Sequence, residues 1–520
     1  MKKSLRWILG LVLLLVIASV LWVLSNLNDR HPGYSMNISV DGKEAPVIYS
    51  VGFGKSKITP TLLDTWIDEN NNAKFDDGEE FIDANENGSF DAIWIAGFHN
   101  NKPANGIHDD VWSRAVVLDD GLTRIALVSI DAIGFMYTDV IDIRNMIPKE
   151  LGIDYTLIAS THTHESNDLI GLWGPNIFHS GVDGNHMNWL KQQVISSIKS
   201  AVQALQPATF IFGQDLSGKD SILIKDTRKP IVKATGIQIM QVLNANNDST
   251  MGTLVNWSNH PESLWSKNTL ISSDYPHYIR EALEKGITHN NRNELQGMGG
   301  TSVFFSGVIG GLMAPHSSLT VRDSIRQTDY LAPSYEKARA IGEQVAIWSV
   351  EALQKSDTIK KLNPINIFSK TFELPVHNRN FRIASAIGLL DRGMHKWFKT
   401  RTEVCAIKAG PVTFLSIPGE IYPEIIYGGI ENPPGQDYSI EPLEVPPLKD
   451  FMPGKYHFYL GLSNDEVGYI IPKSEWDAEE PWLYINEGDT YGEENSLGPE
   501  TAPIIYSELK KVLQNLSSNQ

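Results

Sequence analysis

The chain has 520 residues, with 44 Lys and Arg against 62 Asp and Glu, so its formal net charge at pH 7 is −18. This charge argues against nucleic acid or an anionic lipid surface as the main partner of the part that follows the N-terminal segment. A single cysteine, Cys405, excludes an intramolecular disulfide framework. The length suffices for one large domain or for two to three ordinary ones.

The N-terminal segment predicts a membrane anchor. Three basic residues among the first six precede the uncharged apolar run Trp7–Leu24, which reaches the lower length limit for a bilayer span. No small-x-small cleavage site follows before Asp29, so the pattern favours an uncleaved signal anchor over a cleaved signal peptide. The basic residues hold the N-terminus inside, which places the rest of the chain outside the cytoplasm, in the periplasm or at the cell surface. We predict residues 1–30 as this transmembrane segment and the start of a linker, and 25–45 as the polar linker.

Two acidic loops within residues 64–91 repeat one pattern of oxygen-bearing side chains. The pattern Asp-x-Asn-x-Asn, followed by Asp at position 9, starts at residue 68 and again fifteen residues later at residue 83. Oxygen atoms at these positions wrap a hard cation, and the glutamate at position 12 of the first copy completes a calcium shell. Ala73 replaces the usual glycine in the first copy, and Trp94 replaces the closing carboxylate in the second. We predict a calcium-binding insertion, with a plain acidic loop as the alternative. Its ligands would be Asp68, Asn70, Asn72, Asp76, Glu79, Asp83, Asn85, Asn87 and Asp91.

Residues 46–515 alternate between short β-rich runs and helical patterns, and no clean linker divides them. The predicted strands are Arg124–Asp131, Thr156–Ser160, Thr209–Gly213, Gly236–Val242, Thr253–Trp257, Ser302–Ser306, Val404–Ala409 and Val412–Ile417. The predicted helices are Trp189–Leu205, Tyr278–Lys285, Tyr335–Lys355 and Ala502–Leu513. This mixture predicts one α/β or mixed α+β domain with a mixed β-sheet core.

Four segments place metal-ligand side chains at the ends of apolar strands. Ser160-Thr161-His162-Thr163-His164-Glu165 follows the first of these strands, and His260 follows another just before Pro261. Glu420 comes after the strand that ends in Ile417-Pro418-Gly419, and Tyr469 lies in the fourth segment. Two imidazoles, a carboxylate and a phenol form a plausible zinc shell with room for water. Sites of this kind lie beyond the strand ends of open sheets.

In sequence order, these segments resemble the catalytic domain of the neutral/alkaline (non-lysosomal) ceramidases. The resemblance covers roughly residues 50–500. It is carried by VGFGKSKITP (51–60), GIHDDVWSRAVVLDDG (106–121), LVSIDAIG (127–134), STHTH (160–164), NWSNHPESL (256–264), SSDYPHYIREAL (272–283), IPGEIYPE (417–424) and GLSNDEVGYI (461–470).

The resemblance implies a zinc-dependent amidohydrolase that acts on an N-acyl amide in sphingolipid metabolism. By likeness to the family motifs, the zinc ligands would be His162, His260, Glu420 and Tyr469. Zinc lowers the pKa of a bound water to about 7 and polarises the scissile carbonyl. His164 would stabilise or protonate the tetrahedral intermediate, while Asp131 and Asp274 would orient the ligand imidazoles.

The segment that contacts the substrate departs from the family pattern. Ceramidases carry a serine there for the substrate hydroxyls, where this chain has Gly307, and an aspartate where it has Gly311. Ser306 is adjacent, but in a strand it would point to the opposite face. The C-terminal immunoglobulin-like domain of the ceramidases also has no counterpart in this sequence. We therefore expect a lipid-like N-acyl amide substrate without a clear preference for ceramide, with Leu169–Trp173 as apolar surface for an acyl chain.

Two other functions stay open at this point. One is a non-catalytic envelope binding protein that keeps the fold and the calcium loop, which the loss of the family aspartate at Gly311 favours. The other is a metallophosphoesterase, which the segment Asn259–Glu262 and the H-x-H pattern favour. The early D-x-H and the G-D-x-x-D that such enzymes need do not occur in order.

Overall fold

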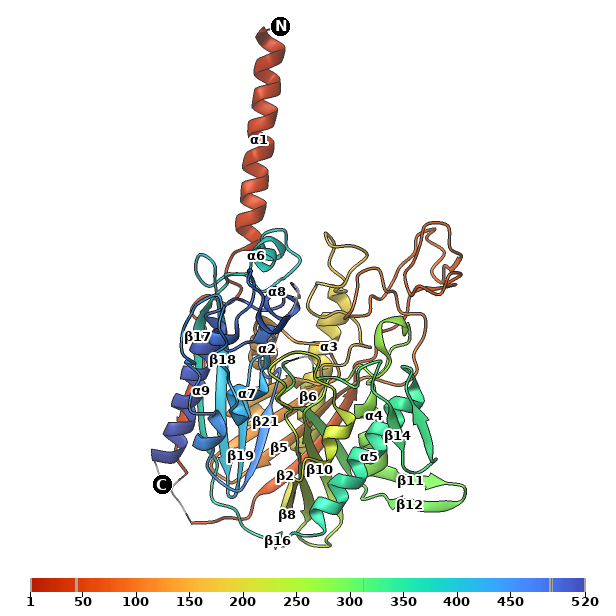
Figure 1. Ribbon diagram of the computed structural model, residues 1–520, viewed down its shortest axis with the longest axis vertical. Coiled ribbons are helices and arrows are strands. Elements are labelled where there is room, and N and C mark those ends of the chain that lie inside the picture. The colour runs from red at the N-terminus through yellow and green to blue at the C-terminus, as the bar shows by residue number, and fades with distance from the viewer. Residues whose placement is uncertain (1, 43–44, 312, 486–487, 489, 519–520) are drawn as a thin grey trace.

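The structure is a computed structural model that describes residues 2–42, 45–311, 313–485, 488 and 490–518. Two β-sheets pack face to face, and helices cover the outer face of each sheet (Figure 1). The layer between the sheets is apolar, with Phe210 and Phe212 from the larger sheet and Phe414 and Phe458 from the smaller one. This arrangement confirms the predicted α/β class with a mixed β-sheet core.

The larger sheet has nine strands in the order β13-β10-β9-β8-β2-β5-β6-β7, with β16 paired to β8. Two pairs, β6–β7 and β10–β13, are parallel, and the other neighbours are antiparallel. Its strands are β2 (Ser50–Lys57), β5 (Trp112–Asp119), β6 (Arg124–Ile130), β7 (Tyr155–Ser160), β8 (Gln206–Asp215), β9 (Ile237–Asn244), β10 (Thr250–Trp257), β13 (Thr301–Ser306) and β16 (Thr358–Ile359).

The twist of this sheet brings its two edges together. Side chains from the β5–β7 side donate to carbonyls of β13: Ser129 Oγ to Phe304 O at 2.6 Å, and Arg114 Nη1 to Ser302 O at 2.8 Å. In return, Ser306 Oγ of β13 donates to the carbonyl of Thr161 at 2.6 Å. The residues that follow β7 and β10 therefore lie close together, although these strands are far apart in the sheet order.

The smaller sheet has the order β1-β17-β18-β19-β21 and packs over the larger one. Its strands are β1 (Asn37–Val40), β17 (Asn366–Pro375), β18 (Lys399–Ala409), β19 (Val412–Ser416) and β21 (Tyr456–Leu460). The pairing of β1 with β17 corrects the reading of 25–45 as a linker, because part of this segment adds a strand to the domain.

Helices α3 (Gly184–Gln203), α4 (Tyr275–Lys285) and α5 (Tyr335–Leu353) cover the larger sheet, and α9 (Thr501–Ser518) covers β17 and β18 of the smaller one. The shorter helices are α2 (Tyr137–Met146), α6 (Arg379–Ala386), α7 (Pro423–Tyr427) and α8 (Tyr491–Glu494). The remaining short strands are β3 (Thr65–Trp66), β4 (Phe81–Ile82), β11 (Gly286–His289), β12 (Arg292–Gln296), β14 (Val321–Asp323), β15 (Thr328–Tyr330), β20 (Glu420–Ile421) and β22 (Tyr469–Ile470).

All of the predicted strands and helices are present, and the differences lie at their ends. Helix α3 starts five residues before the predicted Trp189, because the Asp183 carboxylate caps it by accepting from two backbone N–H groups. Helix α4 starts at Tyr275 instead of Tyr278, because Asp274 caps it and a proline occupies its first turn. The capping residues, and not the periodicity of the apolar residues, set where these helices begin.

Helix α1 (Lys2–Asn26) projects from one end of the globular part (Figure 1). The most apolar 18-residue window of Ser4–Asn26 has a mean hydropathy of 2.8 and no buried residue, so by length and composition the helix could cross a membrane or serve as a signal sequence.

Candidate metal centre and substrate pocket

Three strand ends converge where the two sheets meet. His162 follows the edge strand β7, and His260 follows β10, which pairs with the opposite edge strand β13. Glu420 follows β19 of the smaller sheet and forms β20. All three side chains are buried, and the ring centroids of His162 and His260 lie 4.9 Å apart.

Backbone carbonyls fix the orientation of these two imidazoles. His162 Nδ1 lies 2.5 Å from Ile133 O, and His260 Nδ1 lies 2.7 Å from Met313 O. A carbonyl oxygen only accepts, so each Nδ1 carries the hydrogen and each Nε2 presents a lone pair in the neutral ring. His162 also adopts a left-handed backbone conformation (φ +67°), which turns the chain sharply after the strand.

Both Nε2 atoms face the same carboxylate oxygen. Glu420 Oε2 lies 2.9 Å from His260 Nε2 and 3.5 Å from His162 Nε2. Tyr469 pairs in parallel register with Glu420 through β20 and β22, and its side chain hydrogen-bonds the Glu420 carboxylate. All four side chains expected as ligands therefore lie in one cluster.

His164 lies beside this cluster with no hydrogen-bond partner for either ring nitrogen among the described residues. Its ring is buried, 4.9 Å from the ring of His162 and 5.9 Å from that of His260. One nitrogen from each of the three imidazoles lies within 4.8 Å of the others, which is a spacing suited to a metal ion. An unpaired buried imidazole is costly unless a ligand or substrate completes it.

The electrostatics of the cluster favour neutral rings at His162 and His164 and an ionised carboxylate at Glu420, whereas they favour the protonated form of His260. Burial lowers the pKa of His162 to about 4 and holds the pKa of His164 well below its ordinary value, so both rings are neutral. Burial also acts to lower the pKa of His260, but the hydrogen bond and charge of Glu420 outweigh it and raise this pKa. Burial opposes ionisation of Glu420, yet the two imidazoles lower its pKa. A divalent cation would take the place of the proton that His260 and Glu420 share.

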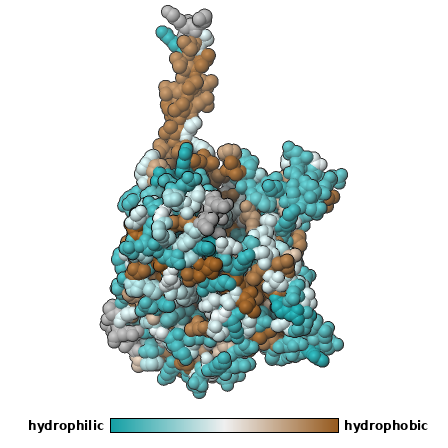
Figure 2. Space-filling view, viewed as in Figure 1, coloured by the Kyte–Doolittle hydropathy of each residue, from teal (hydrophilic) through white to brown (hydrophobic). Residues whose placement is uncertain are grey.

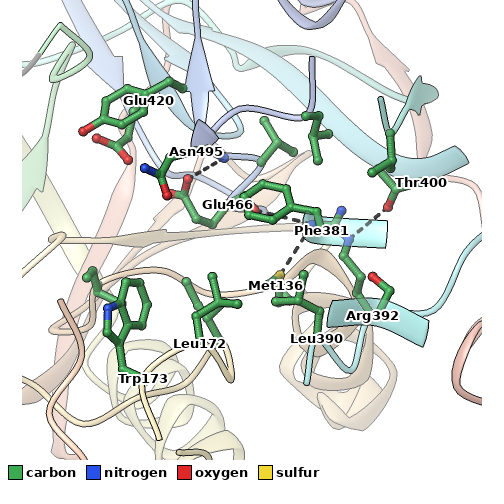
Figure 3. Close-up of a pocket in the computed structure, with 18 of the residues that line it drawn as sticks. Met136, Leu172, Trp173, Phe381, Leu390, Arg392, Thr400, Glu420, Glu466 and Asn495 are labelled. Atoms are coloured by element: carbon green, nitrogen blue, oxygen red, sulfur yellow. Dashed lines mark hydrogen bonds between the residues drawn. The ribbon is translucent and has the colours of Figure 1, made fainter. Parts of the chain in front are cut away.

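A mostly apolar pocket with a volume of about 100 Å³ opens directly onto the cluster. Figure 3 shows Leu172, Trp173, Phe381 and Leu390 around it, with the carboxylates of Glu420 and Glu466 on the polar side. His162, His164 and Tyr469 also line it. An apolar lining with a few convergent polar groups is typical of a small-molecule site.

No family model matches the sequence, and no curated protein matches it. Two similar solved structures are described as "Ceramidase complexed with C2" and as neutral ceramidase from Pseudomonas aeruginosa. The first has a TM-score of 0.62 at 14% identity, over 91% of this chain and 76% of that one. The second has a TM-score of 0.61 at 14% identity, over 91% of this chain and 75% of that one. This chain has the neutral ceramidase fold.

Within the ceramidase fold, the segment after β13 does not reach the pocket. The Ser306 hydroxyl is committed to the carbonyl of Thr161. A Cβ atom at Gly307 would lie 2.3 Å from Ser258 Oγ, and one at Gly311 would lie within 3 Å of the Arg228 guanidinium. None of the three is among the residues that line the pocket. The apolar tract 169–173 does supply pocket wall, through Ile170, Leu172 and Trp173, whereas Leu169 is core.

The expected roles of Asp131 and Asp274 need correction. Asp131 accepts from both terminal nitrogens of Arg280, at 2.8 and 2.9 Å, and from the backbone N–H of Trp112. Asp274 caps α4 and accepts from the N–H of Ser263. These bonds hold the fold behind the site, and carbonyls orient the imidazoles instead.

Sequence reasoning missed three features around His164 and the pocket. Glu262 Oε2 lies 3.7 Å from His164 Nδ1, and burial raises the pKa of this carboxyl to about 7. Lys102 and Glu165 form a fully buried pair at 3.6 Å behind His164. Glu466 has an unpaired buried oxygen, Oε2, and lines the pocket. The sequence shows Glu262 two positions after His260, but it does not show that this side chain faces His164.

The two acidic loops fold alike, as their repeat predicts. In the first, Asp68 accepts from the N–H groups of Asn72 and Ala73, and Asp76 accepts from two asparagine amides. In the second, Asp83 and Asp91 repeat these contacts. The side chains at positions 1, 3, 5 and 9 thus share one concave turn in each copy, and calcium binding there stays a prediction.

Proposed function

We propose that this protein is a zinc-dependent hydrolase that cleaves the amide bond of a lipid-like N-acyl amide. The observation that carries the proposal is the convergence of two oriented imidazoles on one carboxylate at the base of an apolar pocket. The likeness in fold to solved ceramidases, over 91% of this chain, supports the reaction class.

The donor set fits zinc. His162 and His260 would ligate through Nε2, with Glu420 and Tyr469 supplying oxygen, and nitrogen and oxygen donors of this kind are the usual shell of catalytic zinc. The carbonyls of Ile133 and Met313 play the part of the outer partners that fix ligand rings in known zinc sites. Zinc in this position would polarise the amide carbonyl and acidify a water molecule to a pKa of about 7.

The remaining residues would bind and orient the substrate. His164, with two unpaired nitrogens, would hydrogen-bond the carbonyl oxygen of the scissile amide or protonate the departing amine. Ile170, Leu172 and Trp173 would take the acyl chain and exclude water from it. Helix α1 would anchor the enzyme, with its catalytic domain outside the cytoplasm, at a membrane where such substrates partition.

Calcium is a second proposed ion, with a structural role. The two acidic loops at 64–91 offer matched sets of oxygen atoms, distinct from the histidine cluster. Calcium there would stabilise the loops and would not take part in turnover.

The test has two measurements. Elemental mass spectrometry gives the zinc content of the purified protein, and an activity assay gives its hydrolysis of a panel of N-acyl amides. His162→Ala and His260→Ala should lose both zinc and turnover, while His289→Ala, at a surface hairpin, should keep both. Full zinc content and activity in the first two variants would contradict the proposed site. Zinc binding without hydrolysis of any amide would favour the non-catalytic binding protein instead.

A further inference from the structure

The C-terminal end of α1 is docked on the rim of the pocket. Asn26 Nδ2 donates to the carbonyl of Ala386 at the end of α6 (3.0 Å), and the Met394 N–H donates to Leu27 O (3.0 Å). Gly393 approaches so closely that a Cβ there would lie 2.1 Å from Asn28 O. Helix α1 is therefore fixed to the globular part by direct contacts and is not joined to it by a flexible linker.

Ion pairs further fix the chain that leaves α1. Arg30 pairs with Asp391 at 2.6 Å. Arg401 of β18 pairs with Asp29 and donates to the carbonyls of His31 and Tyr34, at 2.7 and 2.8 Å. These bonds set which end of the globular part faces a bilayer that α1 crosses. Figure 1 shows α6 and α8 at that end, at the base of α1.

The segment that receives α1 has an unusual outer surface. Residues 377–401, which we call the α6 rim, contain six Lys or Arg and one Asp, in a chain whose acidic residues exceed its basic ones by 18. Two of the six are turned inward, where Arg392 pairs with Asp465 and Arg401 with Asp29, so four basic side chains remain for the outer surface. Glu373 pairs with two of these lysines, Lys396 and Lys399, which still leaves an excess of positive charge. On the same rim, Ile383 is 47% exposed and Trp397 is 73% exposed. Figure 2 shows hydrophobic side chains at the end of the globular part from which α1 rises.

The inner surface of the α6 rim is pocket wall. Phe381, Ser385, Leu390 and Met394 line the pocket that opens onto the histidine cluster. Beneath them, Ala384 and Leu389 pack with Ile170 and Met136. A single segment thus has apolar and basic side chains on its outside and the substrate pocket on its inside.

We propose that the α6 rim is a membrane-contact surface, through which a lipid substrate passes from the outer leaflet into the pocket. Trp397 and Ile383 would enter the boundary between headgroups and acyl chains, a depth that tryptophan favours, and the basic side chains would meet lipid phosphates. The overall negative charge does not oppose this contact, because screening confines charge effects to about 8–10 Å. Membrane contact rests on α1 being an anchor, and the passage of substrate also rests on the proposed function.

The first test measures depth and does not depend on catalysis. Cys405 is the only cysteine and is fully buried, so a cysteine introduced at the surface can be labelled selectively. Ile383→Cys and Trp397→Cys would carry a nitroxide label in the full-length protein, reconstituted in phosphatidylcholine nanodiscs. Leu122→Cys is the control, because the exposed Leu122 lies in the β5–β6 turn, at the opposite end of β6 from the metal cluster.

Labels at 383 and 397 should be more accessible to dissolved oxygen than to a water-soluble nickel complex, and the label at 122 should show the reverse. Equal access of the nickel complex to all three positions would overturn the proposal. The accessibility of the labels does not depend on whether the protein hydrolyses amides. The measurement therefore tests the membrane-contact surface independently of the proposed function.

The second test addresses substrate entry. Trp397→Ser should lower turnover of a long-chain amide embedded in vesicles by about tenfold, because a large apolar side chain no longer enters the bilayer. Its turnover of a short, water-soluble N-acyl amide should stay within about twofold, since the residue is not part of the metal cluster. An equal loss on both substrates would show a structural defect and would contradict passage across the rim.

Discussion

At the scale of single residues, the candidate site depends on which atom each imidazole presents. The Nδ1–H groups of His162 and His260 donate to two backbone carbonyls, which leaves their Nε2 atoms for a metal, while neither ring nitrogen of His164 has a partner among the described residues. The carboxyl group of Glu262 faces it, with Oε2 at 3.7 Å from Nδ1. The same kind of ring therefore has two different environments in one cluster, and the second partner of each ring decides which nitrogen is left for a ligand.

Glu262 should act as a positioning residue for His164. Glu262→Gln keeps the size of the side chain and removes a carboxyl group that faces His164 Nδ1 and, where it is ionised, would orient the ring and favour its protonated form. We expect kcat to fall about 10–100-fold, the usual effect of an outer partner of a catalytic group, with unchanged zinc content. Steady-state kinetics and metal analysis of the variant test this. The matched control is Glu294→Gln on the surface hairpin β11–β12, and a variant at position 262 with the kcat of the parent protein would contradict the assignment.

At the scale of elements, a buried carboxylate joins the two sheets. Glu403 of β18 accepts from both terminal nitrogens of Arg144 in α2, at 2.7 and 2.9 Å, and from the hydroxyls of Tyr155 in β7 and Tyr137 in α2, at 2.6 and 2.8 Å. Burial acts to raise its pKa, but Arg144 and these hydroxyls outweigh burial and lower it below the ordinary value.

Glu403→Gln should lower the free energy of unfolding by about 3–5 kcal/mol at pH 7, because it leaves the buried Arg144 without its counter-charge. The folded-state pKa of Glu403 is lowered, so its stabilising effect is complete above the unfolded carboxyl pKa of about 4.3 and is lost as pH falls below it. Urea unfolding of both proteins across this pH range measures the effect. A difference that stays constant down to the acid transition would show that the charge of Glu403 does not contribute.

Helix α3 lies directly on β2 because the strand presents glycine to it. A Cβ at Gly52 would lie 2.0 Å from the carbonyl oxygen of Ala201, and one at Gly54 would lie 2.2 Å from that of Ser197. Gly52→Ala should therefore destabilise the fold by about 1–3 kcal/mol or more, since backbone on both sides must shift. Gly184→Ala, in the first turn of the same helix with nothing within 4 Å of its Cβ, should be neutral or slightly stabilising. Thermal unfolding of the two variants makes the comparison, and equal melting temperatures would contradict this account of the contact.

At the scale of the whole molecule, calcium bound in the loops at 64–91 should stabilise the fold without contacting the histidine cluster. With zinc restored, removal of calcium by a chelator should lower the melting temperature, because a ligand at 100 times its dissociation constant adds about 2.7 kcal/mol to the folded state. A variant that combines Asp68→Asn with Asp83→Asn should lose this dependence and keep its zinc. Differential scanning calorimetry tests the prediction, and a melting temperature that calcium does not change would leave the loops as acidic surface.

The substrate preference is also a property of the whole pocket. The hydroxyl of Ser306 is bonded to the backbone, and Gly307 supplies no side chain, so this segment offers no partner for sphingoid hydroxyls. We expect similar kcat/KM values for ceramide and for simpler long-chain N-acyl amides, within about tenfold. Mass-spectrometric assays of both in the same vesicles give the ratio, and a preference for ceramide by orders of magnitude would contradict this expectation.

The sequence by itself determined the elements and the composition of the cluster. Apolar runs that end in polar turns located the strands before His162, His260 and Glu420, because a buried strand needs a continuous apolar segment whatever it packs against. The repeat at 64–91 determined two similar loops in the same way, since Asp and Asn side chains bond their own backbone. These are local properties, and local chemistry is what a sequence displays directly.

Only the tertiary structure decided which buried groups meet. From the sequence, Asp131 was expected to orient a ligand histidine, but its carboxylate bonds Arg280. The carbonyls of Ile133 and Met313 hold the imidazoles instead. The α6 rim became pocket wall and the docking site of α1, although its sequence shows no motif. The physical reason is that these contacts depend on the closure of the two edges of the larger sheet and on its packing against the smaller one. Such contacts join residues between 29 and 360 positions apart in the chain. The periodicity of a sequence indicates that a side chain is buried but not which residue it contacts.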